Sequence, residues 1–453
     1  MFTSINPANG KHLAEYKNFT DAELEAKISM AQNAYMHWSE NTFGERKRLM
    51  LKLAEYLLSN KHKYARTITA EMGKPIKQAI AEIEKCAQCC EYYAMVAERM
   101  LAPENRKSDY SYSAIHYEPI GVIYIIMPWN FPFWQVIRCA APAIMAGNTI
   151  LLKHAENVPQ CAQALELAFL ESGFANGVFQ NLFISHTQSD KVIENENIRA
   201  VSLTGSGRAG AIVASQAAKH LKKSVLELGG SDPFIVLADA DVDFTAKNAA
   251  NARMQNAGQS CIAAKRFIVL KEVAEEFTKK FIEEINKLKI GDPQNENTDI
   301  GPLARKDLLE TIVKQVDESV AKGAHILTGG KMLQGDGFYY QPTVLTNINA
   351  DSPAFKEELF GPVASLFVVE TEEEAVELAN NTQFGLGASI WSKNTNHALA
   401  LSAKIKSGCV YINTIVKSDP RLPFGGIKAS GFGRELSDIG IKEFVNLKTT
   451  VIG

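Results

Sequence analysis

Cys261 stands where a protein scaffold often presents side chains for chemistry. It ends the turn-forming run Asn-Ala-Gly-Gln-Ser-Cys (256–261), and a β-forming segment follows it. Loops of this kind carry many catalytic side chains, and a thiolate there can act as a nucleophile. The alternative is a structural thiol, because most cysteines are buried and inert. The cysteines that fit this alternative share an apolar helical pattern: Cys86, Cys89, Cys90, Cys139 and Cys161.

A carboxylate and an amide are candidates to act with this thiol. Glu227 lies in the run Val-Leu-Glu-Leu-Gly-Gly (225–230), at an apolar strand end where desolvation raises a carboxyl pKa towards that of a general base. Asn130, in Pro-Trp-Asn-Phe-Pro (128–132), follows a strand and precedes a helix. It suits a helix N-cap and equally a hydrogen-bond donor to an oxyanion. The residues leave these two roles open.

A glycine-rich turn indicates a nucleotide. The run Gly-Ser-Gly-Arg-Ala-Gly (205–210) follows a strand and opens a helix, which is the context for a pyrophosphate at a helix N-terminus. Glu227 follows about 20 residues later, where the dinucleotide fingerprint has an acid for the ribose. The motif therefore offers Glu227 a second role, ribose ligand, that competes with general base.

An α/β scaffold must position these residues. From Ile120 onward, Val/Ile-rich runs alternate with helical segments, which predicts βαβ units and a doubly wound parallel sheet. Its strands are expected at 120–127, 148–153, 178–184, 199–203, 223–228 and 233–237. A second α/β series follows, with strand 265–270, helices 272–288 and 304–322, and strands near 342, 366, 388 and 410. We place the boundary between the two units near Gly229-Gly230.

The chain also has helical and terminal elements outside these series. A capping box at 20–23 opens an amphipathic helix, and helical texture continues to about Met100. The closing segment 444–452 alternates weakly and needs an edge to pair with. A hairpin at 108–118 or another subunit can supply that edge.

Composition excludes several classes of partner. The 453 residues are 46% hydrophobic and 22% charged, with a net charge of −3 and no basic run, so neither nucleic acid nor a membrane surface is expected. The longest apolar stretch, 120–129, is about half the ~20 residues that a spanning helix needs. No targeting segment is visible, and seven cysteines in a long chain do not resemble a disulfide framework. We expect a cytoplasmic protein, and no metal site, because the 86–90 cysteine cluster lacks a second Cys/His pair.

Seven motifs in this order resemble the aldehyde dehydrogenase superfamily. They are PWNFP (128–132), LKHAEN (152–157), LTGS (203–206), LELGG (226–230), GQSC (258–261), EELFGP (357–362) and PFGGIKASGFGRE (423–435). Within it, the chain is most similar to bacterial NAD-dependent succinate-semialdehyde dehydrogenases. The resemblance implies an aldehyde dehydrogenase-like α/β fold. Its parts would be a Rossmann-type cofactor domain (1–107 and 119–229), an α/β catalytic domain (230–428) and a small β oligomerisation element (108–118 and 443–453).

The resemblance also implies a role for each motif residue. Cys261 is the nucleophile, Glu227 activates water, and Asn130 donates to the oxyanion beside the Cys261 backbone N–H. Glu156 then takes the ribose, so the GxGxxG match is partly coincidental. The other residues expected around the dinucleotide are Trp129, Lys153, Gly205, Ser206, Leu228, Glu358 and Phe360.

Arg138 is expected to select the substrate. Phe131, Trp134 or Gln135, and Arg138 share a helix face that continues from Asn130, and a guanidinium there can bind both oxygens of a distal carboxylate. The alternative is an arginine paired with a structural acid. The succinate-semialdehyde enzymes that this chain resembles have arginine at this position, whereas general aliphatic enzymes commonly have an aromatic residue.

Two positions depart from these enzymes. Many of them have a second arginine six residues before the nucleophile, where this chain has Gln255, so Ser418 or Arg421 is expected to complete the carboxylate site. Some have a second cysteine two residues after the nucleophile, where this chain has Ala263, so no disulfide switch is expected.

The expected activity is oxidation of succinate semialdehyde to succinate. Glutarate semialdehyde or a broader range of aldehydes is the alternative, because one methylene changes binding by only ~1 to 3 kcal/mol. A cysteine hydrolase is the alternative of another class. Glu156 would repel a 2′-phosphate, so NAD is expected in preference to NADP. A homodimer or homotetramer is expected from the resemblance and the terminal strand.

Overall fold

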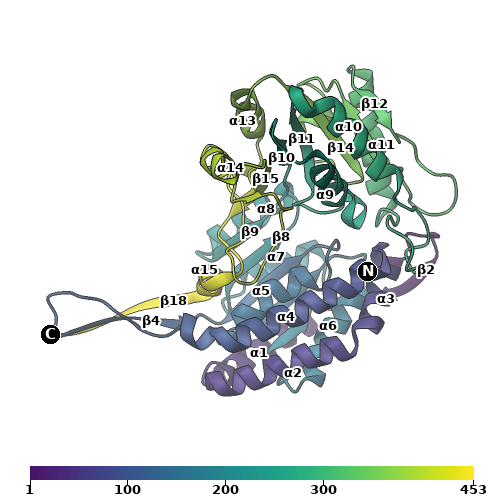
Figure 1. The fold of residues 1–453 in the computed structure, drawn as a ribbon. Coiled ribbons are helices and arrows are strands. Elements are labelled where there is room, and N and C mark those ends of the chain that lie inside the picture. The colour runs from purple at the N-terminus through teal and green to yellow at the C-terminus, as the bar shows by residue number, and fades with distance from the viewer.

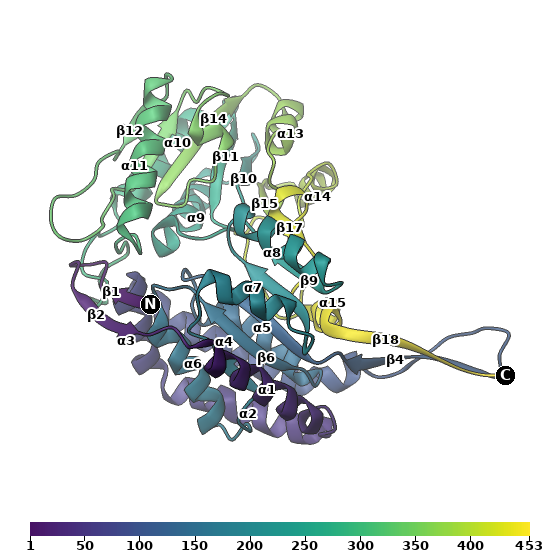
Figure 2. The same cartoon turned by 180° about the vertical axis from the view of Figure 1, so that it is seen from behind.

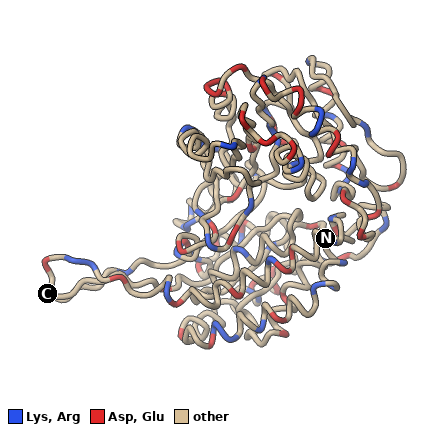
Figure 3. Tube along the Cα trace, viewed as in Figure 1, with Lys and Arg blue, Asp and Glu red and all other residues tan.

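The computed structural model describes residues 1–453 as two lobes, each built on a β-sheet, with a long β arm projecting from one of them (Figures 1 and 2). Charged residues of both signs are interspersed along the chain (Figure 3). None of its helices is long and apolar enough to cross a membrane.

The first sheet is the predicted doubly wound one. Its strands run in the order β17-β9-β8-β5-β6-β7, and all but β17 are parallel. The parallel strands are buried on both faces, which is why they read as continuous apolar runs. Their bounds are β5 (Val122–Met127), β6 (Thr149–His154), β7 (Phe179–Asn181), β8 (Ile198–Thr204) and β9 (Lys223–Glu227), with β17 at Gly431–Phe432.

Helices cover this sheet. Capping boxes at Thr20 and Thr42 start the first two. The helices are α1 (Asp21–Trp38), α2 (Phe43–Ser59), α3 (Lys61–Met72), α4 (Ile76–Met100), α5 (Trp134–Met145), α6 (Pro159–Glu171), α7 (His186–Glu194), α8 (Gly207–Lys219) and α15 (Ser437–Ile441). Two carboxylates cap neighbours across space: Glu71 accepts from the N–H groups of Gln160 and Cys161, and Glu82 caps α5.

The second sheet has the order β12-β13-β14-β11-β10-β15-β16, and only β12 is antiparallel to its neighbour. Its strands are β10 (Asp232–Val236), β11 (Ala264–Leu270), β12 (His325–Thr328), β13 (Thr343–Thr346), β14 (Val363–Val369), β15 (Gly387–Trp391) and β16 (Cys409–Ile412). Its helices are α9 (Val242–Met254), α10 (Lys271–Asn286), α11 (Lys306–Ala321), α12 (Pro353–Lys356), α13 (Glu372–Asn380) and α14 (Thr395–Ser402).

The arm gives the closing segment its partner within the same chain. β18 (Val445–Ile452) pairs antiparallel with β4 (Tyr112–Pro119), from Val445 opposite Pro119 to Ile452 opposite Tyr112, and β3 (Glu104–Asn105) completes the sheet. Large apolar side chains on the arm remain exposed: Tyr110, Tyr112, Leu447, Val451 and Ile452.

One hairpin is absent from the sequence prediction. β1 (Phe2–Ile5) and β2 (His12–Tyr16) form a two-stranded sheet, and the buried Phe2 contacts Phe183. Short 3₁₀ segments span Gln255–Gly258, Lys428–Ser430 and Lys442–Phe444.

The site lies where the two sheets face each other. β5 is flanked by β6 on one side and β8 on the other, so the strand order of the first sheet reverses between β5 and β8. Ligands of open α/β sheets bind outside the carboxyl ends of the strands at such a point. The chain passes from the carboxyl end of β9 directly to the amino end of β10, which brings both sheets to one crevice.

Candidate active site

The loop that carries Cys261 is tightly constrained. Asn256 and Ala257 have positive φ values of 54° and 52°, a left-handed conformation that costs about 1 to 3 kcal/mol per non-glycine residue. Gly258 follows with φ 71°, and a Cβ there would lie 2.1 Å from the Gly361 carbonyl oxygen. Backbone strain of this kind persists only where the surroundings hold the loop in place.

Hydrogen bonds supply that support. The Gln259 side chain donates to the Asn256 carbonyl at 3.1 Å and accepts from the Ala304 N–H at 2.9 Å. The Arg253 guanidinium donates to the carbonyls of Gly258 and Leu359 at 3.3 and 2.7 Å. The loop that carries Cys261 is therefore fixed to both the second sheet and the segment that carries Glu358.

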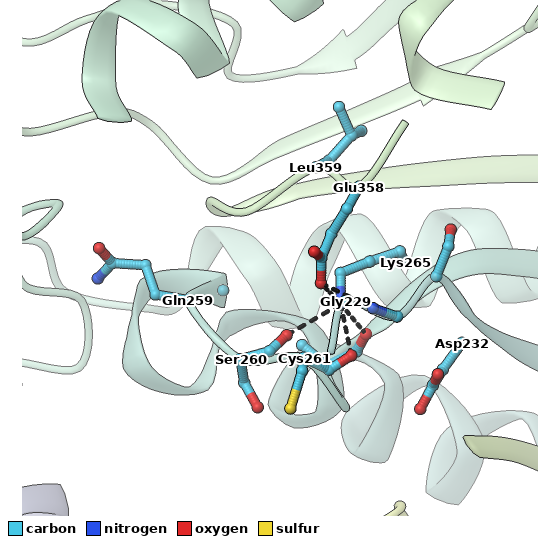
Figure 4. A network of polar contacts seen from close by, with 12 residues as sticks. Gly229, Asp232, Gln259, Ser260, Cys261, Lys265, Glu358 and Leu359 are labelled. Atoms are coloured by element: carbon cyan, nitrogen blue, oxygen red, sulfur yellow. Dashed lines mark hydrogen bonds and ion pairs between the residues drawn. The ribbon is translucent and has the colours of Figure 1, made fainter. Parts of the chain in front are cut away.

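Lys265 holds the backbone of the loop that carries Cys261, on the side opposite the thiol (Figure 4). Its Nζ donates to the carbonyls of Ser260, Cys261 and Ala263 at 2.9, 2.8 and 3.2 Å, and lies 3.4 Å from the Glu358 carboxylate. All three ammonium hydrogens are thus used. In Figure 4 the loop carbonyls turn towards Lys265 while the Cys261 sulfur points away from it.

Burial controls the Cys261 thiol. It raises the thiol pKa to about 12, while the charges of Arg138 and Lys265 act in the opposite direction. Cys261 lines a cavity of about 610 Å³. The thiol is therefore protonated at neutral pH in this structure, and reaction requires its conversion to the thiolate.

Asn130 forms a hydrogen bond with the loop that carries Cys261 and does not cap a helix. Helix α5 begins only at Trp134, and its first N–H groups, those of Phe133 and Trp134, donate to the Glu82 carboxylate at 2.9 and 3.0 Å. The N-cap interpretation of Asn130 is therefore wrong. Its Nδ2 instead donates to the carbonyl of Gln259 at 3.1 Å, two residues from Cys261.

Glu227 is a buried carboxyl at the end of β9 with neither oxygen hydrogen-bonded. Burial raises its pKa well above the usual range, opposed by the charge of Arg138 and reinforced by that of Glu435. A Cβ at Gly425 would lie 2.6 Å from its Oε1, so the backbone of the glycine-rich loop packs directly on the carboxyl. A raised pKa and free acceptor oxygens are properties of a general base.

Arg138 forms a buried ion pair with Glu435. Its guanidinium also donates to the Thr204 hydroxyl at 3.3 Å, and its side chain is 2% exposed. This is the alternative considered above, an arginine paired with a structural acid. Arg138 nevertheless lines the cavity together with Phe131 and Gln135.

Arg138→Ala should destabilise the protein, because it leaves the Glu435 carboxyl buried without its partner. The expected loss in free energy of unfolding is about 3 to 5 kcal/mol, measured by urea denaturation. Arg138→Met combined with Glu435→Gln is the control and should recover much of this loss, since no unpaired charge remains. Equal losses in the single and double variants would contradict the ion-pair explanation.

The crevice suits a dinucleotide. Ser206, at the carboxyl end of β8, caps α8, whose N-terminus is exposed beside Gly205. Leu228 packs so closely that a Cβ at Gly210 would lie 2.7 Å from it. Trp129 and Phe360 meet edge to face with ring centroids 5.8 Å apart. The exposed helix terminus fits phosphate and the aromatic pair fits a flat ring system.

Three further residues are predicted as cofactor contacts. Lys153 is buried in β6, and Glu156 follows it with half of its side chain exposed, 3.8 Å from His186. Glu358 accepts from the Gly230 N–H at 3.0 Å. No cluster of three or more His, Cys, Asp or Glu side chains could hold a metal ion.

The substrate side is the cavity that reaches Cys261. Its lining includes the predicted residues Phe131, Gln135, Arg138, Ser418 and Arg421. Arg421 is on the exposed rim, where it pairs with Asp419. No histidine lines the cavity, and burial together with a hydrogen bond to the Pro132 carbonyl occupies His154. The partner that a cysteine hydrolase needs is therefore missing.

Sequence reasoning missed two cations, Lys85 and Lys265. Lys85 lines the cavity from α4, and its ammonium donates to the Ser418 hydroxyl at 2.8 Å. A signal existed: Gln78, Glu82 and Lys85 recur at helical spacing on one face of the amphipathic helix α4, and all three line the cavity.

A half-buried cysteine that lines a cavity beside a doubly wound α/β sheet indicates a dinucleotide-dependent enzyme. Residues 1–450 match the aldehyde dehydrogenase family, and the chain belongs to it. It is 51% identical to a probable NADP(+) succinate-semialdehyde dehydrogenase of Synechocystis sp., over 99% of both chains. It is 44% identical to a succinate semialdehyde dehydrogenase [NAD(P)+] of Escherichia coli, over 98% of this chain and 96% of the other. A structure of succinic semialdehyde dehydrogenase from Streptococcus pyogenes with NADP+ matches with a TM-score of 0.98 and 38% identity, covering 100% of both chains.

These relatives contradict the expected preference for NAD. The Synechocystis protein is named for NADP+, and the Streptococcus pyogenes structure contains NADP+. The charge of Glu156 is a weak basis for that preference, because the side chain is half exposed and water screens it. Lys153 nearby also carries the opposite charge.

Proposed function

We propose that this chain oxidises succinate semialdehyde to succinate, with a nicotinamide dinucleotide as the oxidant. The observation that carries the proposal is the cavity in which Cys261 shares one space with cations and with the Ser418 hydroxyl. A carboxylated aldehyde fits such a space, because its aldehyde carbon can reach the sulfur while its carboxylate meets positive charge. The names of the relatives support the same substrate.

The proposed reaction begins with the Cys261 thiolate, which forms a bond to the aldehyde carbon. The carbonyl oxygen gains the negative charge, and the Asn130 amide and the Cys261 N–H donate to it. When bound, the nicotinamide accepts the hydride that leaves this carbon. A thioester on Cys261 remains. Glu227 takes a proton from water, whose oxygen attacks the thioester carbon and releases succinate and the thiolate.

We assign the predicted cofactor contacts to this dinucleotide. Glu156 would bind the adenosine ribose, and the remaining residues would surround the rest of the dinucleotide: Trp129, Lys153, Gly205, Ser206, Leu228, Glu358 and Phe360. The lobe built on β5–β9 then serves as the dinucleotide-binding domain and the lobe built on β10–β16 as the catalytic domain. We further propose a cytoplasmic homodimer or homotetramer in which the exposed apolar side chains of the arm are covered by another subunit.

The substrate is tested by NAD(P)H absorbance with succinate semialdehyde, glutarate semialdehyde and butanal, using NADP+ and NAD+ in parallel. Succinate semialdehyde should exceed butanal, its uncharged four-carbon counterpart, in kcat/KM by roughly 100-fold, the contribution of a charge-assisted hydrogen bond or two. Glutarate semialdehyde should be a poorer substrate by about 10-fold, the value of one methylene. Preference for butanal would overturn the proposed function.

A further inference from the structure

Lys85 is one of the cations that line the substrate cavity. It comes from α4, its ammonium donates to the Ser418 hydroxyl at 2.8 Å, and it lies 4.1 Å from the centroid of the Trp134 ring. All three residues line the cavity that contains Cys261. The ring and the hydroxyl hold the ammonium in one position at the cavity wall.

The two arginines that line the cavity already have partners, and the remaining lysine of the lining, Lys417, is on the exposed rim. Arg138 is paired with Glu435, and Arg421 with Asp419 at 2.6 Å. The acids next to Lys85 on α4 are also engaged, Glu82 with Lys74 and Glu84 with Lys61. Lys85 forms no ion pair with any acid of this chain, so its charge is available to a ligand.

Ser418 is prepared to donate a hydrogen bond. Its oxygen accepts from the Lys85 ammonium and, at 3.0 Å, from the Trp134 indole N–H. A hydroxyl has two acceptor lone pairs and one hydrogen. With both lone pairs occupied, the hydroxyl hydrogen of Ser418 is left as a donor beside the ammonium. An ammonium and an adjacent hydroxyl donor form a site for an anion.

We infer that Lys85, with the Ser418 hydroxyl beside it, binds the distal carboxylate of the aldehyde substrate and so determines the preference for a carboxylated aldehyde. This assignment rests on the proposed function. It replaces Arg138, which the sequence analysis predicts for this role, as the residue that binds the carboxylate. The charge of Arg138 is paired with that of Glu435. Arg138 therefore forms part of the cavity wall but offers no unpaired charge to the substrate.

The electrostatics of Lys85 agree with this role. Burial lowers its pKa to about 8, and the charge of Arg138 on α5 lowers it further, while Cys86, Cys89 and Glu82 on α4 act weakly in the opposite direction. A half-buried ammonium without a counter-charge is destabilised. A bound carboxylate would supply the counter-charge and hold the ammonium protonated.

The test compares Lys85→Met with Lys417→Met. Lys417 lies on the exposed rim of the same cavity and provides a control for a general change in charge. With succinate semialdehyde and butanal as the two substrates, Lys85→Met should reduce the ratio of their kcat/KM values about 10- to 100-fold, mainly through a higher KM for succinate semialdehyde. Lys417→Met should change that ratio by less than about twofold, as expected for an exposed charge in water. Ser418→Ala should reduce the ratio by a smaller factor, about fivefold, because one neutral donor is lost.

The outcomes separate the two proposals. A wild-type enzyme that prefers butanal overturns the proposed function, whatever the variants do. A wild-type enzyme that prefers succinate semialdehyde, with an unchanged ratio in Lys85→Met, overturns the assignment of Lys85 alone. Equal loss of activity on both aldehydes in Lys85→Met also overturns it. Lys85→Arg keeps the charge and should retain selectivity for succinate semialdehyde; loss of selectivity in Lys85→Arg equal to that in Lys85→Met would contradict a role for the charge.

Discussion

Cys261→Ala is expected to lower kcat/KM for aldehyde oxidation about ten-thousandfold or more, because no other thiol lines the cavity to form the thioester. The remaining cysteines cannot replace it. Five are fully buried, and Cys409 lies on β16 with its thiol directed at the Leu386 carbonyl. Steady-state NAD(P)H absorbance measures the loss, and Cys409→Ala should retain wild-type activity within about twofold.

The same thiol predicts a pH dependence. Because burial raises the pKa of Cys261 to about 12, the thiolate fraction is small at neutral pH and grows as the pH rises. Alkylation by iodoacetamide should therefore accelerate about tenfold per pH unit between pH 7 and 9, as measured by mass spectrometry of the labelled peptide. A flat profile, or alkylation of a different cysteine at the same rate, would contradict the assignment of Cys261.

The elements that depend on local pattern could be predicted from the sequence. Strands β5, β6 and β8 lie where the Val/Ile-rich runs placed them, because strands of a parallel sheet are buried on both faces and their sequence records this. The β1–β2 hairpin was missed, since its strands are short and only Phe2 and Ser4 within them are buried. Its position depends on contacts with distant residues such as Phe183.

The candidate site shows the same limit. The motifs singled out Cys261 and Asn130 because each lies in a turn beside a strand, and the structure brings the two turns together through the Asn130–Gln259 hydrogen bond. The partner of Arg138 could not be read from spacing, because Glu435 lies almost 300 residues away along the chain and meets it only in the folded core. Helix periodicity therefore put Arg138 on the cavity wall but could not reveal that its charge was already paired.

Lys85 was missed for a related reason. Its helix, α4, comes before every recognised motif, and on sequence a lysine in an amphipathic helix indicates a solvated face. Only the packing of α4 against α5 and the 415–421 segment places this lysine beside Ser418. Similarly, Glu82 caps α5 from another helix, so neighbouring residues alone could not exclude Asn130 as the cap.

Glu227→Gln is expected to separate the two halves of the reaction. Glutamine has nearly the same shape but cannot take a proton from water, so hydride transfer proceeds once per site and hydrolysis of the thioester then stalls. Rapid mixing with succinate semialdehyde should show a burst of NAD(P)H equal to the number of active sites. The following steady rate should be about 100- to 10,000-fold below that of the wild type. Because burial also raises the pKa of Glu227, the wild-type hydrolysis step should accelerate as the pH rises through that pKa and the carboxylate forms. Full steady turnover in Glu227→Gln, or the absence of a burst, would remove Glu227 from the role of general base.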